Sequence, residues 1–384
     1  MSLVVERREQ LSFVVGIPFL LALGLLSSSG FAPTRGIRIV EVGRFDFTGG
    51  DNADPRQVAE GLSGIVHVAD DQYLVVGDLH AYLHRVAIEL DPSTGQILSA
   101  AFGTPLPLTD SLGFVFPEPE QGKDREGVIY DPPTGSVWIA NERTGSDTTM
   151  PSIAQHSLET GEMTAILIAS RGSPLYVFSN IRPNLGFESL TRRPDGSEIW
   201  TANEQSLTVD GDRPTTSEGA VVRLQRFDGT FRPVAQYAYV TAPLSGTTPA
   251  RIVEWGISGV VDLLALSEGT LLVLERAVVG GPAGEPTVRV RIYQVDFTRA
   301  TDISRSPWAS GLIDAAEPYT PVQKQLLIEL TGRTGAGSNS NLEGLALGPR
   351  LENGDHSLIL VADNATGTSQ TLYALRLSGL NREP

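Results

Sequence analysis

Three pairs of acidic residues stand at the ends of short apolar runs in this chain. The pairs are Glu126 with Glu142, Glu188 with Glu204, and Glu343 with Asp363. Burying a carboxylate costs free energy unless it is paired with a cation or coordinates a metal ion. Acids that border buried strands therefore predict either ion pairs or a metal site.

The same arrangement occurs twice more, with serine in place of the first acid. These two segments begin at Ser63 and Ser258 and end at Asp78 and Glu275. All five segments contain an apolar run, a turn rich in Gly, Asp, Pro or Ser, and a second apolar run, a pattern that predicts a β-hairpin. In an antiparallel hairpin the start of the first strand lies across from the end of the second, so the two ends of each segment are expected to be close.

Further strand-like runs indicate the architecture that positions these hairpins. Two runs follow each of the first four hairpins, one follows the fifth, and one more at 37–45 precedes the first. Four strands per repeated unit predict an all-β fold, a five-bladed β-propeller whose last blade is closed by the N-terminal strand. Six blades remain open because residues 300–320 could hold further strands. A pair of β-sandwiches explains neither the repeat nor the strand missing after the fifth hairpin.

The acids are expected to converge at one mouth of the central channel, because the innermost strands of a propeller run in the same direction. Carboxylates this close raise one another's pKa unless cations neutralise them. An oxygen-rich cluster with few histidines favours Ca²⁺ or Mg²⁺ over zinc, and we expect Ca²⁺. The predicted metal ligands are Asp78, Glu126, Glu142, Glu188, Glu204, Glu275, Glu343 and Asp363.

Basic residues beside these acids leave a second interpretation open. Arg125, Arg143 and Arg276 each adjoin one of the predicted ligands. They could hold the oxygens of a phosphate group, which guanidinium groups bind in a bidentate manner. They could instead form ion pairs with the acids, which would then have only a structural role.

The composition excludes several classes of protein. The chain has 384 residues, a formal net charge of −16 and no cysteine, and its pI is about 4.8. It contains no basic stripe of the kind that binds nucleic acid. The lack of cysteine excludes disulfides, thiol catalysis and thiolate metal sites. We expect a soluble monomer that does not bind nucleic acid.

The N-terminus predicts export to the periplasm or the cell exterior. Arg7 and Arg8 precede an apolar run at 11–26 and then small residues, which is the order of a secretory signal. The predicted division is a signal peptide at 1–32 and a single propeller domain at 33–384. The apolar run could instead stay as a membrane anchor, the only route by which we expect the protein to contact a membrane.

Motifs in four of the hairpins resemble those of the "esterase-like activity of phytase" family. They are GLSGI, REGVIYDP with WIANE, GFESLTRRPDGSEIWTANE, and NLEGLALGP with LILVADN. The resemblance covers most of the chain and implies an exported, mostly bacterial type of β-propeller that hydrolyses phosphoric or carboxylic esters. The R-H-G-x-R-x-P signature of other phytases is absent, and the loop DNADP at 51–55 matches the acidic motif of alkaline propeller phytases only loosely.

Two functions remain open on these grounds. As a hydrolase, the protein would hold Ca²⁺ among the acids and use Glu126, Glu188 and Glu343 in catalysis. The substrate would be a small anionic ester or phosphoester, bound by the three arginines. A metal ion acts as a Lewis acid and lowers the pKa of bound water, while a spare carboxylate serves as general base. As a non-catalytic propeller, the protein would bind a ligand or partner at the same channel mouth, with ions or ion pairs in structural roles.

Overall fold

The structure is a computed structural model that describes nine segments of the chain. They are residues 36–48, 59–114, 124–142, 150–245, 255–266, 269–280, 287–330, 341–363 and 369–380. The predicted signal segment at 1–32, the DNADP loop at 51–55 and Arg143 lie outside the described residues. Among the residues it does describe, no helix is long and apolar enough to cross a membrane.

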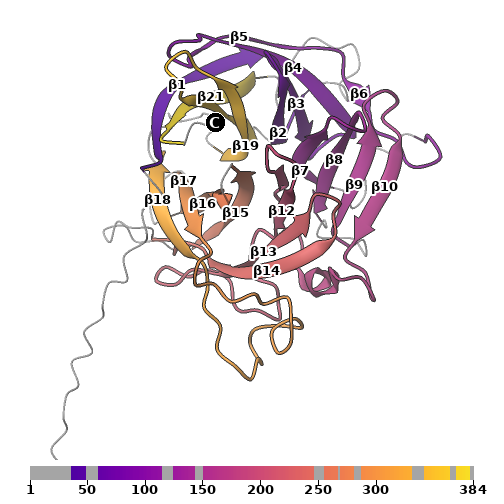
Figure 1. Ribbon diagram of the computed structural model, residues 1–384, viewed down its shortest axis with the longest axis vertical. Coiled ribbons are helices and arrows are strands. Elements are labelled where there is room, and N and C mark those ends of the chain that lie inside the picture. The colour runs from indigo at the N-terminus through magenta and orange to yellow at the C-terminus, as the bar shows by residue number, and fades with distance from the viewer. Residues whose placement is uncertain are drawn as a thin grey trace, which may run out of the picture. The chain divides into compact units, whose positions relative to one another are not determined.

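Five antiparallel sheets form a ring around a central axis (Figure 1). From the axis outward, the first blade consists of β2 (Leu62–Ala69), β3 (Gln72–Gly77), β4 (Tyr82–Leu90) and β5 (Ile97–Phe102), with β6 (Leu106–Pro107) also paired to β4. The second blade consists of β7 (Asp124–Asp131), β8 (Ser136–Glu142), β9 (Ser152–Ser157) and β10 (Met163–Ile168). The third consists of β11 (Thr191–Arg192), β12 (Glu198–Ala202), β13 (Val221–Asp228) and β14 (Pro233–Val240), and a 3₁₀ helix, η2 (Tyr176–Asn180), precedes it.

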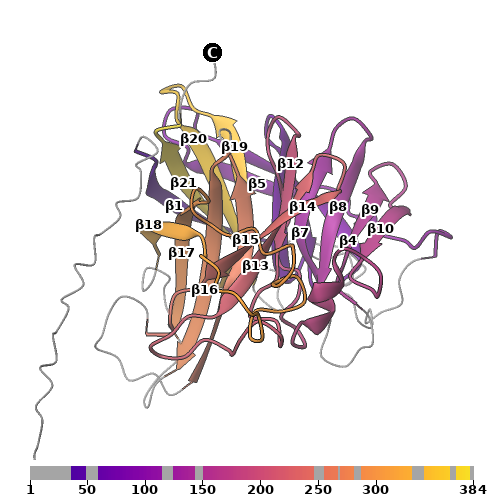
Figure 2. The same ribbon diagram turned by 60° about the horizontal axis from the view of Figure 1, so that its bottom comes forward.

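The last two blades complete the ring, which Figure 2 shows tilted so that the blades stand side by side as twisted sheets. The fourth blade consists of β15 (Trp255–Ala265), β16 (Leu271–Gly280), β17 (Thr287–Asp296) and β18 (Gln323–Glu329). The fifth consists of β19 (Asn341–Arg350), β20 (His356–Asp363), β21 (Ser369–Ser378) and β1 (Arg38–Thr48). Each predicted hairpin therefore forms the inner half of one blade.

The N-terminal strand closes the ring, as predicted. β1 pairs antiparallel with β21, from Arg38 opposite Ser378 to Thr48 opposite Ser369. The fifth blade thus combines strands from both ends of the described chain. Because the outermost strand of that blade comes from the other end of the sequence, opening the ring would require this whole pairing to break.

The connection between β17 and β18 does not form a sixth blade. Residues 297–322, all of which the structure describes, contain no strand. This connection packs instead against the outer strand of the third blade. The backbone N–H of Ile303 donates to the carbonyl of Gln236, and that of Val322 donates to the carbonyl of Ala238, both at 2.9 Å. The prediction of five blades is confirmed.

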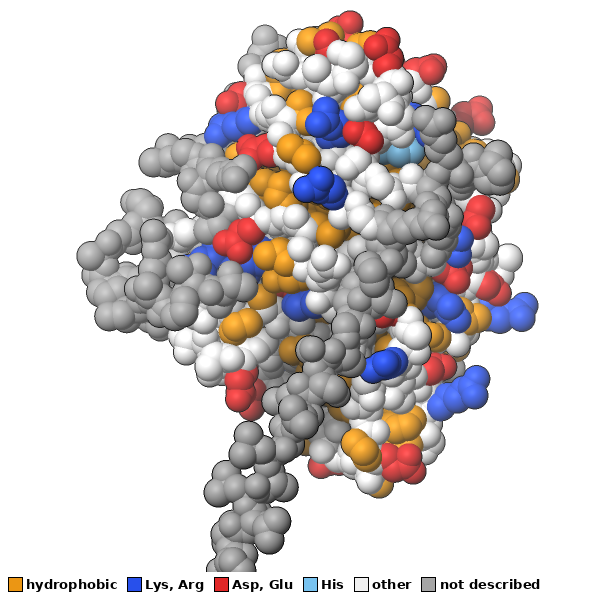
Figure 3. Space-filling model, turned by 60° about the vertical axis from the view of Figure 1, so that its left-hand side comes forward, with side chains coloured by type: hydrophobic (Ala, Val, Ile, Leu, Met, Phe, Trp, Pro, Cys, Tyr) orange, Lys and Arg blue, Asp and Glu red, His pale blue; other side chains and the backbone are white. Residues whose placement is uncertain are grey.

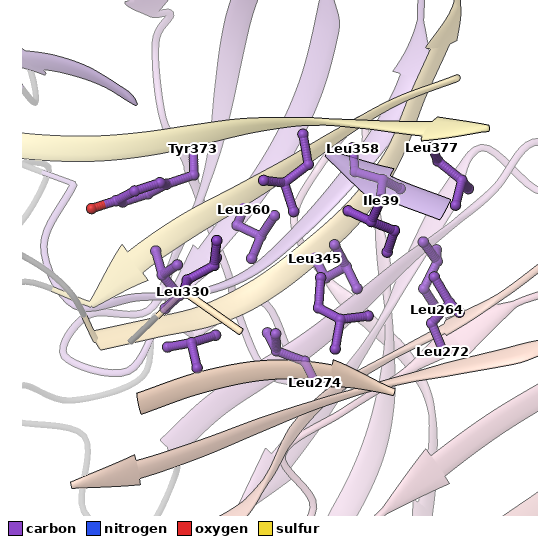
Figure 4. Close-up of a cluster of buried hydrophobic side chains, with 14 of the residues drawn as sticks. Ile39, Leu264, Leu272, Leu274, Leu330, Leu345, Leu358, Leu360, Tyr373 and Leu377 are labelled. Atoms are coloured by element: carbon purple, nitrogen blue, oxygen red, sulfur yellow. The ribbon is translucent and has the colours of Figure 1, made fainter. Parts of the chain in front are cut away.

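Hydrophobic side chains fill the space between adjacent blades. Between the fourth and fifth blades, Leu264 and Leu274 belong to one cluster with Leu345 and Leu360 (Figure 4), and none of the four is more than 7% exposed. Complete burial of a leucine side chain contributes about 1.5–3 kcal/mol. Interfaces of this kind hold the innermost strands in place around the axis.

The outer surface carries charges of both signs. On the face shown in Figure 3, Lys and Arg side chains are interspersed with Asp and Glu among hydrophobic ones. Among the described residues on that face, neither sign forms a continuous patch. The acidic pairs of the sequence lie elsewhere, at the axis.

Glycines let the innermost strands approach one another closely. A Cβ added at Gly64 would overlap the carbonyl oxygen of Glu126, and one added at Gly127 would overlap the backbone of the third blade. A Cβ added at Gly344 would lie 2.7 Å from the carbonyl oxygen of Ser63. We define the glycine waist as Gly64, Gly127, Gly259 and Gly344. Each of these glycines follows a leading acid or serine, so the motif that carries the acids also narrows the ring.

Replacing Gly127 with alanine is expected to destabilise the fold by about 1–3 kcal/mol, because the new methyl group overlaps backbone that is held by the next blade. Gly43→Ala is the matched control, since a Cβ there meets no atom within 4 Å and such surface changes alter stability by less than about 0.5 kcal/mol. Urea denaturation of the two variants measures the difference. Equal midpoints for both would contradict the close approach at the glycine waist.

Candidate metal centre at the acidic end of the channel

Eight carboxylates lie together around the points where the innermost strands begin. They are Asp78, Asp124, Glu126, Glu142, Glu188, Glu204, Glu343 and Asp363. Their mutual electrostatic influence extends around the ring, from Asp363 through Asp78 and Glu126 to Glu188 and Glu204. We call this set the acidic cluster. It contains all of the predicted metal ligands except one.

Glu142 is shared by two groups of three carboxylates. One group adds Asp124 and Glu126 to Glu142, and the other adds Glu188 and Glu204; within each group the donor oxygens lie within 4.8 Å of one another. Two ligands that each stand about 2.3–2.6 Å from one Ca²⁺ ion can be up to about 5 Å apart. The structure thus brings Glu126 to Glu142 and Glu188 to Glu204, as the hairpins predicted, at separations that one cation can span.

Burial and mutual repulsion raise the pKa of the carboxyls in these two groups. Glu126 and Glu188 are buried, and burial followed by the neighbouring carboxylates holds the pKa of both well above the usual range. Burial also raises the pKa of Glu142, although the backbone N–H of Gly186 donates a hydrogen bond to its Oε1. The ionised form of the cluster therefore requires compensating positive charge close by.

The other side of the acidic cluster titrates nearer to neutral pH. Burial, followed by repulsion from Asp363 and Asp124, raises the pKa of Asp78 to about 8. Burial raises the pKa of Glu343 to about 7, against the opposing effect of Arg276. These two carboxyls change charge within the physiological range of pH.

β-Bulges place the leading glutamates beside the closing acids. In the second blade, Asp124 rather than Glu126 lies directly opposite Glu142, and Glu126 falls within a shift of register. In the fifth blade, the residue opposite Asp363 is Asn341, and the leading glutamate again falls within a shift. A bulge adds one residue to a strand and re-aims its side chain. The bulges therefore determine which residue lies directly opposite the closing acid, Asp124 in the second blade and Asn341 in the fifth.

Asp124 is the member of the acidic cluster that the sequence analysis missed. It lies two residues before Glu126, and residues two apart in a strand project from the same face. Burial raises its pKa, while hydrogen bonding with Glu126 and the charge of Arg125 act in the opposite direction. The spacing within DREG was the available signal.

Glu275 is the predicted ligand that the structure does not bring to the cluster. Its Oε1 accepts hydrogen bonds from Tyr239 Oη, at 2.6 Å, and from Lys324 Nζ, and its Oε2 accepts one from the backbone N–H of Ala242 at 2.9 Å. Tyr239 belongs to β14, Ala242 to the segment after it, and Lys324 to β18. All three lie away from the axis. Glu275 lies opposite Val260 in β15, so it sits too early in its strand to reach the position of the other closing acids.

Arg276, the next residue, faces the acidic cluster instead. Its Nη2 donates to Glu204 Oε1 at 2.9 Å, and its Nη1 donates to Asn341 Oδ1 at 3.0 Å and also to Glu343 Oε1. The Arg276 side chain is 13% exposed, and its guanidinium group bridges the third and fifth blades. Ion pairing with the acids, which the sequence analysis left open as an alternative to phosphate binding, is therefore present at Arg276.

The remaining arginines are placed differently. Arg125 is buried in β7, and its charge opposes the rise in the pKa of Asp124. Burial raises the pKa of Glu204, and the charges of Arg276 and then Arg213 oppose that rise. Arg213, which the sequence analysis did not single out, is exposed. Arg143, the third predicted arginine, lies outside the described residues.

A further buried acid ties the fourth and fifth blades together. Asp262 Oδ2 accepts a hydrogen bond from the backbone N–H of Leu345 at 2.7 Å, and its Oδ1 accepts one from the N–H of Leu263 at 2.8 Å. Burial raises its pKa well above the usual range. This acid holds two innermost strands at their spacing and belongs to the scaffold of the site.

Fold and site together define a five-bladed β-propeller with a carboxylate cluster at one end of its channel. The model of the phytase-like family, described as esterase-like activity of phytase, matches residues 57–365. The chain belongs to this family, and family and fold together support a hydrolase-like propeller. No curated protein matches the chain.

Solved structures share only a distant likeness with the chain. The PQQ-bound aldose sugar dehydrogenase from Streptomyces coelicolor is 12% identical, with a TM-score of 0.37, over 90% of this chain and 100% of that one. An alpha-L-arabinofuranosidase from Podospora anserina, in complex with cellotriose, is 11% identical, with a TM-score of 0.39, over 90% and 98% of the two chains. A thermostable family-43 glycoside hydrolase is 9% identical, with a TM-score of 0.41, over 84% and 95%.

Without added metal, the free energy of unfolding is expected to fall by more than about 1.4 kcal/mol, the equivalent of one pKa unit, between pH 5 and pH 8. The pKa values of folded Asp78 and Glu343 are about 8 and about 7, above the ~3.9 and ~4.3 of unfolded carboxyls. The folded state therefore holds more protons across this range, so stability declines as pH rises.

Urea denaturation at pH 5, 6.5 and 8 in EDTA measures this decline. Asp78→Asn is expected to flatten it, because the amide has no proton to lose, whereas Asp71→Asn, on the exposed turn of the same hairpin, is expected to leave it unchanged. A decline that is equally steep in all three proteins would contradict the assignment to the acidic cluster.

Proposed function

We propose that the protein is an exported, calcium-dependent hydrolase of phosphoric or carboxylic esters that acts at the acidic end of its channel. The observation that carries the proposal is the acidic cluster itself, with two groups of three carboxylates that share Glu142. Buried acids at this density are compatible with a stable fold only if protons or cations neutralise them. Family membership supports ester hydrolysis as the reaction class.

The donor atoms of the cluster fit a hard divalent cation. Glu126, Glu142, Glu188 and Glu204 offer only carboxylate oxygens, the ligands that Ca²⁺ prefers, and six to eight such oxygens can surround it. Bound Ca²⁺ supplies Lewis-acid polarisation of an ester oxygen and a lower pKa for a water ligand. The negative charge of the acidic cluster also favours binding of the cation, since every ligand in both groups is an acid.

Glu343 is the best-placed general base among the three predicted catalytic glutamates. Its Oε1 accepts hydrogen bonds from Arg276 and Asn341, and its Oε2 lies 3.4 Å from the hydroxyl of Ser63, which donates to it. In the metal-free protein, burial raises the pKa of Glu343 to about 7, and a general base is most effective when its pKa lies near the operating pH. Glu126 and Glu188 belong to the two metal-holding groups and serve as ligands.

The substrate is a small anionic ester or phosphoester in this proposal. Arg276 is engaged by Glu204 and Glu343, so its role is to fix these acids rather than to bind phosphate. Arg213 is exposed and close enough for its charge to oppose the rise in the pKa of Glu204 that burial causes, which suits it to contact the anionic group. The protein would act as a monomer, because each site is complete within one ring.

Export is the remaining part of the proposal. It rests on the basic, apolar and small-residue order of residues 1–32. A periplasmic or extracellular location would also expose the cluster to calcium concentrations above those of the cytosol. N-terminal sequencing of the mature protein would show whether the segment is removed or retained as an anchor.

Calcium is expected to bind the protein and to raise its melting temperature. Glu142→Gln is expected to weaken calcium affinity at least about tenfold, or 1.4 kcal/mol, because both groups of three carboxylates lose a negative charge. Glu275→Gln is the matched control, an equally buried glutamate outside the cluster, and should leave the affinity unchanged. Isothermal titration calorimetry after EDTA treatment measures both. Equal affinities for Glu142→Gln and the control would remove the cluster as the calcium site.

Hydrolysis of p-nitrophenyl phosphate or p-nitrophenyl acetate is expected with calcium and is expected to be lost in EDTA. Glu343→Gln is expected to lower kcat by roughly 10²–10⁴-fold, the usual contribution of a general base, while calcium affinity stays within a few-fold. Absorbance of released p-nitrophenol measures both rates. If calcium binds but neither ester is hydrolysed, the protein is a non-catalytic propeller, and the acidic cluster is a ligand-binding or structural ion site.

A further inference from the structure

A cavity of about 530 Å³ lies on the same innermost strands, beyond the residues that carry the acids. Consecutive residues from all five blades line it, namely 65–68, 128–130, 190–196, 263–265 and 345–347. The leading acids and serines precede these residues on strands that all run in the same direction, so the cavity and the acidic cluster occupy opposite ends of the channel. Its volume is within the range of about 300–1,000 Å³ that is typical of small-molecule sites.

The glycine waist separates the cavity from the acidic cluster. In the fifth blade, Glu343 faces the cluster, Gly344 belongs to the waist, and Leu345 lines the cavity. The first two blades repeat this order, because the residues that line the cavity begin at Ile65, directly after Gly64, and at Val128, directly after Gly127. At the waist, neighbouring strands are so close that a Cβ would meet backbone. The two ends are therefore distinct sites built on the same strands.

The cavity has an apolar floor and a half-exposed rim. Val66 and Leu347 line the floor and are half-buried, whereas Ile65 and Leu345 beside them pack into the hydrophobic clusters between blades. His67 and Arg192, nearer to the hairpin turns, are half-buried. The cavity is thus a funnel that opens to solvent on the side away from the acids. Its aliphatic floor favours the apolar body of a ligand, which gains free energy by leaving water.

Strand edges also line the funnel. Each innermost strand is the last strand of its sheet, so only one of its edges is paired within that sheet. Consecutive residues, rather than alternate ones, line the cavity, which indicates that backbone edges face it, since side chains alternate between faces. Backbone N–H and C=O groups of such edges can bind a ligand that carries a hydrogen-bonding group.

The charged groups at the rim are already paired. Arg192 contacts the carboxylate of Asp131 in the second blade. Arg193 lies 3.3 Å from Asp195 and 3.8 Å from Glu198. Because acids match the arginines here, the rim has no surplus positive charge to hold an anion. In this respect the funnel differs from the acidic cluster, where negative charge dominates.

We propose that this funnel binds a neutral organic small molecule with an apolar body and a hydrogen-bonding group. The apolar body lies against the half-buried side chains of Val66 and Leu347, and the polar group meets the strand edges. The proposal is independent of the calcium site and of catalysis. It assigns the propeller a second ligand, on the opposite end of its channel.

Two matched dyes test the proposal on the full-length protein. N-phenyl-1-naphthylamine is neutral, and 8-anilino-1-naphthalenesulfonate is nearly the same molecule with a sulfonate added. The neutral dye is expected to bind at a single saturable site, at least about tenfold more tightly than the anionic dye, by fluorescence titration. Absence of saturable binding, or tighter binding of the anionic dye, would overturn the proposal.

Variants locate the bound dye. Leu347→Arg places a charge on the floor of the funnel and is expected to weaken binding of the neutral dye at least fivefold. Leu326→Arg, on the outer strand of the fourth blade and 38% exposed, is the matched control and should leave binding unchanged. Glu142→Gln should also leave it unchanged, which separates this site from the calcium site. Equal weakening by the two arginine variants would place the dye outside the funnel.

Methyl NMR of the wild-type protein provides a measurement that does not depend on any variant folding. Titration with the neutral dye is expected to shift the methyl resonances of Val66 and Leu347 and to leave those of Leu326 in place. Shifts confined to residues outside the lining of the funnel would overturn the assignment.

Discussion

The close approach of five innermost strands around one axis is the constraint on which the rest of the molecule depends. At Gly64 and Gly127 a single methyl group would overlap the neighbouring blade, so the radius of the ring is set by backbone contact. Hydrophobic interfaces between blades hold the strands at this distance. The pairing of β1 with β21 prevents the ring from opening.

This geometry forces the acids together and so determines the electrostatics of the site. Glu126 and Glu188 are held next to the waist, where burial and then the neighbouring carboxylates raise their pKa values. Arg276 neutralises part of the charge through Glu204 and Glu343. The negative charge of the two groups that share Glu142 still has to be neutralised by protons or cations. A calcium site is the proposal that meets this demand at neutral pH.

The same constraint divides the channel into two chemically different ends. Before the waist, the leading residues are acids or serines; after it, apolar residues such as Val66 and Leu347 line the funnel. One strand thus presents an ionic surface and an apolar one within a few residues. The second binding site that we propose therefore needs no domain beyond the propeller.

The sequence alone predicted the four-stranded unit, the closing strand and five blades, because turn residues and apolar runs are local signals that recur with each repeat. The sixth blade that it left open was excluded only by the structure, in which residues 297–322 contain no strand. The sequence also identified seven of the eight acids at the axis, since the ends of a hairpin meet. Only the tertiary structure decided that Glu275 turns toward Lys324 while Arg276 faces the acids, because neighbouring side chains of a strand point to opposite faces and register depends on pairing. The bulges at Glu126 and Glu343, and the apolar funnel, likewise arise from contacts between strands distant in sequence, which no local pattern specifies.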